Sequence, residues 1–161
     1  MLSDDSCQLE GKNQALFEQY RKMANGNAAP ELRFENSKSG FKQLSDLKNK
    51  FKLVIFVSSW CPKCIEEIPK IKAVYDGWKE KDDLGVLAVS LDTDKEKYET
   101  FTRDIISITS CDLKGWKGQA AGDYYVFATP TMYLLDANNV IMVKPVSPGQ
   151  TTAWLDMLRV R

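Results

Sequence analysis

Apolar runs and stretches of helical periodicity alternate along this chain, and this alternation predicts an α/β protein. The clearest apolar run is 53–57, LVIFV, which is short and rich in β-branched and aromatic residues and therefore predicts a buried strand. A helix is expected directly behind it, because Pro62 suits a first helical turn. The apolar face of this helix would carry the residues that recur at helical spacing: Ile65, Ile68, Ile71, Tyr75 and Trp78.

The second half of the chain repeats the alternation and ends in a hairpin. Residues 84–91 predict a second buried strand, and Thr93 with Glu96 forms a capping-box signature for the next helix. Residues 131–135 and 140–143 flank a polar turn and predict two antiparallel strands. The order strand–helix–strand–helix before them predicts parallel pairing with right-handed crossovers.

The remaining segments give weaker signals. Residues 9–23 carry a sparse apolar stripe, so we expect a partly helical N-terminal extension, 1–27, before a single domain, 28–161. Within the domain, 31–35 alternates polar and apolar residues and predicts a half-exposed strand. Other short elements are expected as a helical turn at 44–47, an added strand and helix within 106–116, a short helix at 117–125 and a last helix after 148.

Composition indicates one globular domain without a charged partner. The chain has 161 residues, of which 43% are hydrophobic and 27% charged. Lysine plus arginine and aspartate plus glutamate both number 22, so we expect no nucleic acid and no acidic membrane as partner. No apolar run is as long as a membrane span, and 1–5 lacks the apolar stretch of a signal peptide. If the protein is exported, its leader or anchor is expected outside this chain.

The candidate chemistry lies where the first strand meets its helix, at Cys61-Pro62-Lys63-Cys64. Free backbone N–H groups and partial positive charge at a helix N-terminus stabilise a thiolate, and the cation of Lys63 would add to this. Thiols in C-x-x-C sites have pKa values lowered to roughly 3.5–7. Cys64 lies one helical turn further on, where it can attack a mixed disulfide at Cys61. The spacing therefore predicts a reversible, redox-active disulfide.

Other uses of these cysteines fit the sequence less well. A structural zinc site needs four ligands, and the chain has no histidine and no second C-x-x-C, so no metal is expected. Simple packing of Cys61 and Cys64 in a helix would not explain the preceding strand and Trp60. Cys7 and Cys111 could pair with each other, but a sequence does not establish connectivity. A buried, unreactive thiol is the default expectation for Cys111.

The stretch Trp60-Cys61-Pro62-Lys63-Cys64 resembles the active site of thioredoxin-fold proteins. With Glu67 and Pro69 it fits the pattern W-C-x-x-C-x-x-E-x-P and resembles, more closely, the TlpA/ResA-like extracytoplasmic thiol–disulfide oxidoreductases. The resemblance extends over roughly 28–161, and its other matches are Ala29-Pro30, Leu44-Ser45-Asp46-Leu47, Val89-Ser90-Leu91-Asp92 and Ala128-Thr129-Pro130-Thr131.

This resemblance implies a fold and an activity. The expected fold is thioredoxin-like α/β, a central mixed sheet flanked by helices, with a TlpA/ResA-type insertion before the cis-proline hairpin. The implied function is reduction of disulfides in protein substrates, with no cofactor beyond the Cys61–Cys64 pair. An upstream membrane thiol donor and a periplasmic or otherwise extracytoplasmic location, with a membrane anchor outside this chain, are also implied.

The resemblance also assigns site residues. Cys61, Cys64 and Glu67 are the expected catalytic residues. Glu67 is expected to have a raised pKa and to exchange the Cys64 proton, because Ile55 stands where thioredoxins have a buried acid. A solvated helix glutamate is the alternative for Glu67. The substrate-binding residues are expected to be Trp60, Pro62, Lys63, Thr129 and Pro130, with a cis Thr129–Pro130 bond beside the cysteines and the Thr129 backbone free to pair with an extended substrate.

Two other functions stay open at this point. A peroxiredoxin-like peroxidase would share the fold, but Val54 stands where its motif expects proline, and Trp-Cys-x-x-Cys is foreign to it. A non-enzymatic thioredoxin-like binding module would leave the cysteines idle. Peroxide consumption tests the first alternative, and insulin reduction tests the second.

Overall fold

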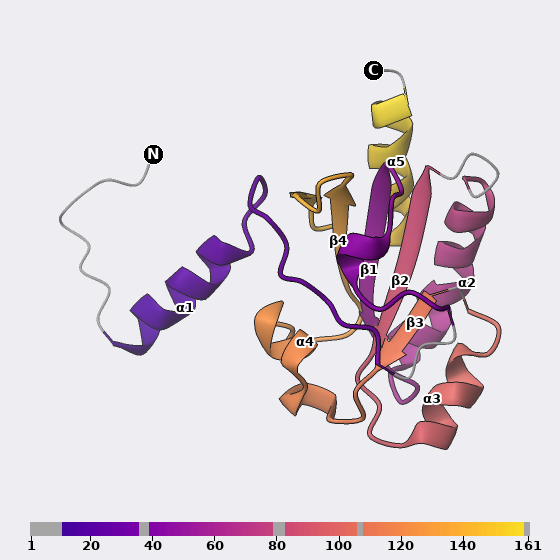
Figure 1. The fold of residues 1–161 in the computed structure, drawn as a ribbon, viewed down its shortest axis with the longest axis horizontal. Coiled ribbons are helices and arrows are strands. Elements are labelled where there is room, and N and C mark those ends of the chain that lie inside the picture. The colour runs from indigo at the N-terminus through magenta and orange to yellow at the C-terminus, as the bar shows by residue number, and fades with distance from the viewer. Residues whose placement is uncertain (1–10, 36–38, 79–82, 106–107, 160–161) are drawn as a thin grey trace.

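The computed structural model describes residues 11–35, 39–78, 83–105 and 108–159. At its centre lies a five-stranded sheet in the order β3-β2-β1-β4-β5 (Figure 1). β1, β2 and β3 run parallel, whereas β4 is antiparallel to both β1 and β5. The sheet is therefore mixed, as expected. Its strands are β1 (Phe51–Val57), β2 (Leu84–Ser90), β3 (Ile108–Cys111), β4 (Thr131–Asp136) and β5 (Ile141–Val143).

Helices follow the strands in the predicted order. The predicted turn at 44–47, the short helix within 117–125 and the last helix after 148 are all present. The added segment after α3 forms β3 and a 3-10 turn, η3, before α4. The helical elements are α1 (Lys12–Lys22), η1 (Leu44–Asp46), α2 (Pro62–Asp76), α3 (Lys95–Thr102), η3 (Gly115–Lys117), α4 (Gln119–Asp123) and α5 (Pro148–Arg159).

The central strand β1 holds a separate hydrophobic core on each face of the sheet. All seven of its residues are buried, and successive side chains point to opposite faces. Ile55 and its neighbours on one face pack with Ile68 and Ile71 of α2 and Leu155 of α5. Phe56 on the other face belongs to the core that lies under η1 and α4. Burial on both sides explains why β1 is apolar at every position except Lys52 rather than alternating.

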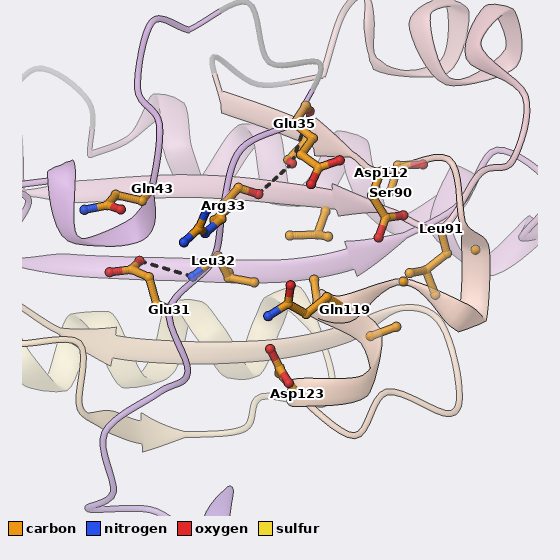
Figure 2. A pocket seen from close by; sticks show the side chains of 16 residues that line it. Glu31, Leu32, Arg33, Glu35, Gln43, Ser90, Leu91, Asp112, Gln119 and Asp123 are labelled. Atoms are coloured by element: carbon orange, nitrogen blue, oxygen red, sulfur yellow. Dashed lines mark hydrogen bonds between the residues drawn. The ribbon is translucent and has the colours of Figure 1, made fainter.

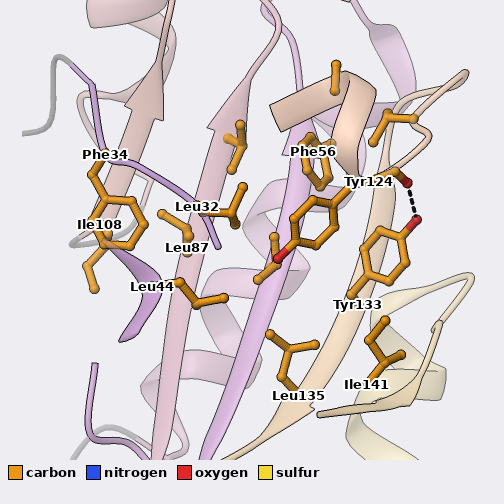
Figure 3. Close-up of a cluster of buried hydrophobic side chains, with 14 of the residues drawn as sticks. Leu32, Phe34, Leu44, Phe56, Leu87, Ile108, Tyr124, Tyr133, Leu135 and Ile141 are labelled. Carbon is orange, nitrogen blue, oxygen red and sulfur yellow. Dashed lines mark hydrogen bonds between the residues drawn. The ribbon is translucent and has the colours of Figure 1, made fainter. Parts of the chain in front are cut away.

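Three aromatic rings pack together in the core under η1 and α4, which we call the second core (Figure 3). The ring of Tyr124 lies 5.2 Å from that of Phe56 and 5.2 Å from that of Tyr133. Both tyrosine hydroxyls are satisfied: Tyr133 donates to the Tyr124 carbonyl at 2.8 Å, and Tyr124 donates to the Pro30 carbonyl at 2.7 Å. These bonds join α4, β4 and the segment that precedes η1 into one packed layer.

The predicted strand at 31–35 is wrong. Leu32 and Phe34 are both buried, and the described part of this segment forms only an isolated bridge, between Arg33 and Gln43. Its backbone bonds instead to the chain around Gln43, through Phe34 N–H to Lys42 and Leu44 N–H to Leu32. The segment therefore covers the second core as an irregular strap.

Two further details depart from the sequence prediction. Ile65 is 55% exposed, because the buried face of α2 runs through Cys64, Ile68 and Ile71. The cap of α3 is Asp94, whose carboxylate accepts the Lys97 N–H at 3.0 Å, and not Thr93. Asp94 lies directly before the first helical residue, which is where a capping side chain reaches the free amides.

The residues that follow α1 contact the domain. Met23 is buried in the second core. Gly26 N–H donates to the Ile141 carbonyl at 2.7 Å, and Ile141 N–H donates to the Asn27 carbonyl at 2.9 Å. This pairing attaches the residues that follow α1 to β5 at the edge of the sheet. In the described part of the chain, no helix has the length and apolarity needed to span a bilayer.

Candidate active site

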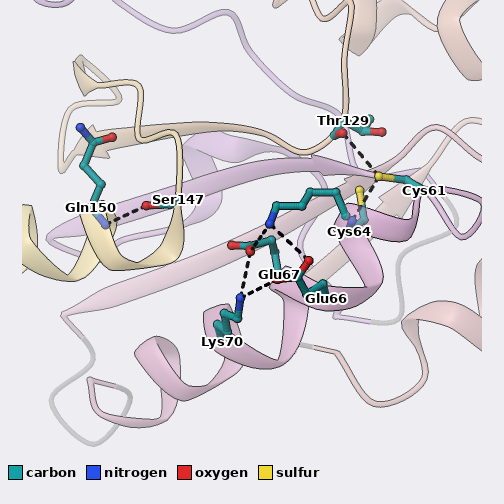
Figure 4. Close-up of polar contacts among 9 residues, drawn as sticks. Cys61, Cys64, Glu66, Glu67, Lys70, Thr129, Ser147 and Gln150 are labelled. Atoms are coloured by element: carbon teal, nitrogen blue, oxygen red, sulfur yellow. Dashed lines mark hydrogen bonds and ion pairs between the residues drawn. The ribbon is translucent and has the colours of Figure 1, made fainter.

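Cys61 lies between the carboxyl end of β1 and the first residue of α2. It is the N-cap of α2: its sulfur accepts the backbone N–H of Cys64 at 3.1 Å (Figure 4). On its other side the Cys61 sulfur lies 3.4 Å from the carbonyl oxygen of Thr129. Serine and aspartate usually supply the capping atom, so here a thiol occupies the position that best stabilises negative charge.

The two thiols of the pair have opposite electrostatic environments. Burial alone would raise the pKa of Cys61. The pKa is nevertheless lowered overall, by side-chain hydrogen bonds with Cys64 and Thr129 and by bonds from the backbone amides of Cys64 and Lys63. Burial raises the pKa of Cys64 to about 12, with the hydrogen bond to Cys61 and the Cys61 charge adding to the effect. Cys61 is therefore the thiol of the pair that ionises at the lower pH.

Glu67 is buried, as expected, but its pKa is shifted in the opposite direction. Its carboxylate lies 3.0 Å from the ammonium of Lys63 and 3.0 Å from that of Lys70 (Figure 4). These ion-paired hydrogen bonds lower the pKa of Glu67. The expected raised pKa is wrong because the two lysines stabilise the charge more than burial opposes it.

The same ion pairs direct the side chain of Lys63 to carboxylates of α2. Its ammonium contacts Glu66 at 3.3 Å as well as Glu67, and these carboxylates raise the pKa of Lys63. The effect of Lys63 on Cys61 comes from its backbone amide. Glu66, whose side chain is 57% exposed, is a solvated helix glutamate.

Asp92 is a site residue that sequence reasoning missed. It follows β2 and is 1% exposed. It accepts hydrogen bonds from Ser59 N–H at 3.1 and 3.2 Å, Ser59 Oγ at 2.6 Å and Ser90 Oγ at 2.6 Å. These bonds hold the turn that carries Cys61. The available signal was position: Asp92 lies just beyond the strand parallel to β1, and carboxyl ends of neighbouring parallel strands meet at one edge.

Of the substrate-binding candidates, Thr129 directly contacts the Cys61 sulfur. Thr129 contacts it through its carbonyl, and the Thr129–Pro130 peptide bond is cis. Thr129 also bonds through its hydroxyl to Ser58 Oγ at 3.3 Å. Trp60 is 54% exposed, and its ring lies 6.0 Å from that of Trp116 in η3. Trp60 is therefore a surface residue beside the sulfur and not a packed core residue.

Cys111 lies at the end of β3 and is fully buried. Its thiol donates to the Asp92 carbonyl at 3.3 Å, and burial raises its pKa. Cys111, Cys61 and Cys64 are all in the thiol form. The expected buried and unreactive thiol agrees with this placement, whereas Cys7 lies outside the described residues. Within the described ranges, no group of three or more histidine, cysteine, aspartate or glutamate side chains could hold a metal.

Away from Cys61 and Cys64, a hollow lies over the sheet between β2, β3 and α4 (Figure 2). It has a volume of about 280 Å³ and a mostly polar rim that includes Glu31, Arg33, Asp112 and Asp123. Neither Cys61 nor Cys64 lines it. The Cys61–Cys64 pair is therefore not part of this hollow.

Comparisons with known proteins agree with this geometry. The model of the AhpC/TSA family matches residues 25–144. The thioredoxin-like protein YneN of Bacillus subtilis is 32% identical over 133 residues, which cover 78% of this chain and 76% of that protein. Thiol-disulfide oxidoreductase ResA of Bacillus cereus is 30% identical over 135 residues, which cover 81% of this chain and 75% of ResA.

Solved structures are similar over nearly the same range. A thiol-disulfide oxidoreductase from Bacteroides fragilis has a TM-score of 0.70 at 25% identity and covers 82% of this chain and 99% of its own. The thioredoxin domain of a thiol-disulfide oxidoreductase from Bacteroides vulgatus has a TM-score of 0.73 at 22% identity, covering 84% and 97%, and supports the thioredoxin-like fold. The chain thus belongs to the AhpC/TSA family, among its thioredoxin-like thiol–disulfide oxidoreductases.

Proposed function

We propose that this protein reduces disulfides in protein substrates by dithiol–disulfide exchange at Cys61 and Cys64. The observation that carries the proposal is the contrast between the two sulfurs. Cys61 caps a helix and has a lowered pKa, whereas Cys64 is buried and has a pKa of about 12. A site with this asymmetry has one nucleophile for entry and one thiol held in reserve.

The reaction has two exchanges. The Cys61 thiolate attacks a substrate disulfide, so a Cys61–substrate disulfide forms and one substrate sulfur leaves as a thiolate. Cys64, having lost its proton to solvent, then attacks the Cys61 sulfur, which forms the Cys61–Cys64 disulfide and releases the second substrate thiolate. Two electrons pass from the cysteine pair to the substrate, and protons from solvent complete its two thiols. A dithiol donor returns the pair to its reduced state.

The timing of the second step follows from the causes of the Cys64 shift. Besides burial, the pKa of Cys64 is raised by its hydrogen bond to Cys61 and by the Cys61 charge. Both contributions end when Cys61 is bound to a substrate sulfur. Formation of the mixed disulfide therefore lowers the pKa of Cys64 and activates it only when it is needed.

Glu67 takes part as an ionised group. Because Lys63 and Lys70 keep its pKa below the ordinary value, Glu67 has no proton to donate near neutral pH. We assign it the role of fixing Lys63 and the first turn of α2. Trp60, Pro62, Lys63, Thr129 and Pro130 form the proposed contact surface for substrate around Cys61.

Location and electron supply belong to the same proposal. An extracytoplasmic site and a membrane thiol donor rest on the resemblance to TlpA/ResA-like proteins. Alkylation of intact cells with a membrane-impermeant maleimide tests the location: an exported protein is labelled at Cys61, and protection until the cells are lysed would contradict it.

The central test is a trapping experiment. Cys64→Ala should accumulate a covalent adduct with a disulfide-bonded substrate through Cys61, while Cys61→Ala should form none and should lose insulin reduction. A Cys61→Ala protein with full exchange activity would refute the proposal. The reduction potential of the pair then tests the direction, because reducing proteins lie near −270 mV and strong oxidants near −120 mV.

A further inference from the structure

The strongest unexplained feature outside the reaction centre is a surface of exposed aromatic side chains next to Cys61. Phe127 is 77% exposed, Trp60 54% and Trp116 47%. Large apolar side chains that gather at the surface of a soluble domain commonly mark an interaction site. Trp116 and Phe127 have no part in the exchange steps proposed above.

These residues continue into a groove that we call the aromatic groove. It has a volume of about 460 Å³ and lies between α1, η3 and the end of α4, lined chiefly by Leu16, Tyr20, Trp116, Tyr125 and Phe127. Its lining contains no charged side chain. An occupant would therefore bury apolar surface there without having to neutralise a charge.

The aromatic groove is connected to the nucleophile by two routes. Trp116 lines the groove and lies 6.0 Å, ring to ring, from Trp60, the residue before Cys61. Phe127 also lines the groove and stands two residues before Thr129, whose carbonyl lies 3.4 Å from the Cys61 sulfur. A chain bound at Cys61 can therefore continue directly into the groove.

The backbone of the groove is held in an unusual conformation. Tyr125 follows α4 with a φ of 50°, a left-handed conformation that favours glycine. The bonds from Val126 N–H to Ala121 and from Tyr125 N–H to Gly122 close the helix there. A tyrosine at a position that suits glycine is strained, and the Tyr125 side chain nevertheless lines the groove.

We infer that the aromatic groove binds the apolar residues that flank the disulfide of an extended polypeptide substrate. The inference rests on the proposed function and defines its substrate class: disulfides in unfolded or extended segments with aromatic or large aliphatic neighbours. It also gives α1 a function, because Leu16 and Tyr20 form one wall of the groove.

A pair of matched peptides tests this. Both carry one cysteine as a mixed disulfide with 5-thio-2-nitrobenzoate. One has phenylalanine and leucine near this cysteine, and the other has serine at the same places. The protein is first reduced with dithiothreitol and freed of it, and release of the coloured thiolate gives a second-order rate constant for each peptide. The ratio of the two constants does not depend on the fraction of protein that is folded.

Wild-type protein should favour the apolar peptide. Leu16→Ser, Trp116→Ser and Phe127→Ser should each lower the ratio by about three- to tenfold, which is the loss expected for one partly buried apolar contact. Val146→Ser is the matched control, since Val146 is 85% exposed and does not line the groove, and its ratio should equal that of wild type.

Other outcomes overturn the inference in distinguishable ways. An unchanged ratio in all three groove variants would show that the groove does not bind the substrate. A wild-type dimer that the groove variants dissociate, again with an unchanged ratio, would assign the groove to a second copy of the chain. If wild-type protein reacted with neither peptide, the proposed function itself would fail.

Discussion

The sulfur of Cys61 accepts the backbone N–H of Cys64 at 3.1 Å, so the proposed nucleophile is itself the cap of the helix that carries the proposed resolving thiol. Formation or loss of charge on Cys61 therefore changes its electrostatic interaction with the first turn of α2 and with Cys64. This backbone bond lowers the pKa of Cys61, and a second bond, between the two side chains, lowers the pKa of Cys61 further and raises that of Cys64.

The first prediction concerns how the two thiols titrate. In reduced protein, the rate of iodoacetamide alkylation at Cys61 should reach half its maximum at a lower pH than for free cysteine, because only the thiolate reacts. In Cys61→Ser, Cys64 should resist alkylation through neutral and mildly alkaline pH, since its pKa is raised by burial as well as by Cys61. Mass spectrometry of quenched samples measures both rates. Equal reactivity of the two thiols would contradict the assigned roles.

The second prediction separates an ionised Glu67 from a proton-carrying one. Glu67 has a lowered pKa, so Glu67→Gln should leave the shape of the pH–rate profile of insulin reduction unchanged between about pH 5 and 8. Glu66→Gln is the matched control, because Glu66 pairs with the same two lysines from an exposed position. An acidic limb that disappears only in Glu67→Gln would restore the role of Glu67 as a proton carrier.

The same carboxylates predict how stability depends on pH. The pKa values of Glu66 and Glu67 are both lower in the folded chain than their ordinary values. Their contribution to stability is therefore present above the ordinary glutamate pKa and is lost as the pH falls through the lower, folded value. Urea unfolding from pH 6 downward should show a smaller loss of stability in the double variant Glu66→Gln and Glu67→Gln than in wild type.

The third set of variants addresses Asp92. Asp92→Asn replaces one acceptor oxygen by an NH2 donor and removes the charge that strengthens the bonds from the Ser59 and Ser90 hydroxyls, so it should destabilise the protein by about 1–3 kcal/mol. Exchange by Cys61 should also slow, because Ser59 is in the turn before it. Asp94→Asn is the control: asparagine caps a helix as well as aspartate does, so unfolding should change little. Equal destabilisation by both variants would contradict the assigned role of Asp92.

A pair of isoleucines on α2 tests which face of the helix is buried. Ile71 is fully buried, and Ile71→Ala should destabilise the protein by about 2–5 kcal/mol in urea unfolding. Ile65 is 55% exposed, so Ile65→Ala should have an effect within about 0.5 kcal/mol. Similar losses for the two variants would mean that Ile65 packs as its spacing suggested.

Local sequence determined the order of the elements and the place of the chemistry. The LVIFV run, the proline at the start of the helix and the two cysteines suffice for strand, helix and redox pair, because these signals depend on near neighbours. The polar turn between β4 and β5 is equally local, and so is the short helix α4.

Tertiary structure decided what depends on residues far apart in the chain. The charge state of Glu67 follows from which lysines reach it, the burial of Leu32 and Phe34 from the sheet beneath them, and the bonds of Asp92 from the placement of β2 beside β1. The aromatic groove joins α1 to residues about a hundred positions later. A linear pattern reports spacing within one element, whereas pKa values, buried polar bonds and surface grooves arise from contacts between elements that only folding brings together.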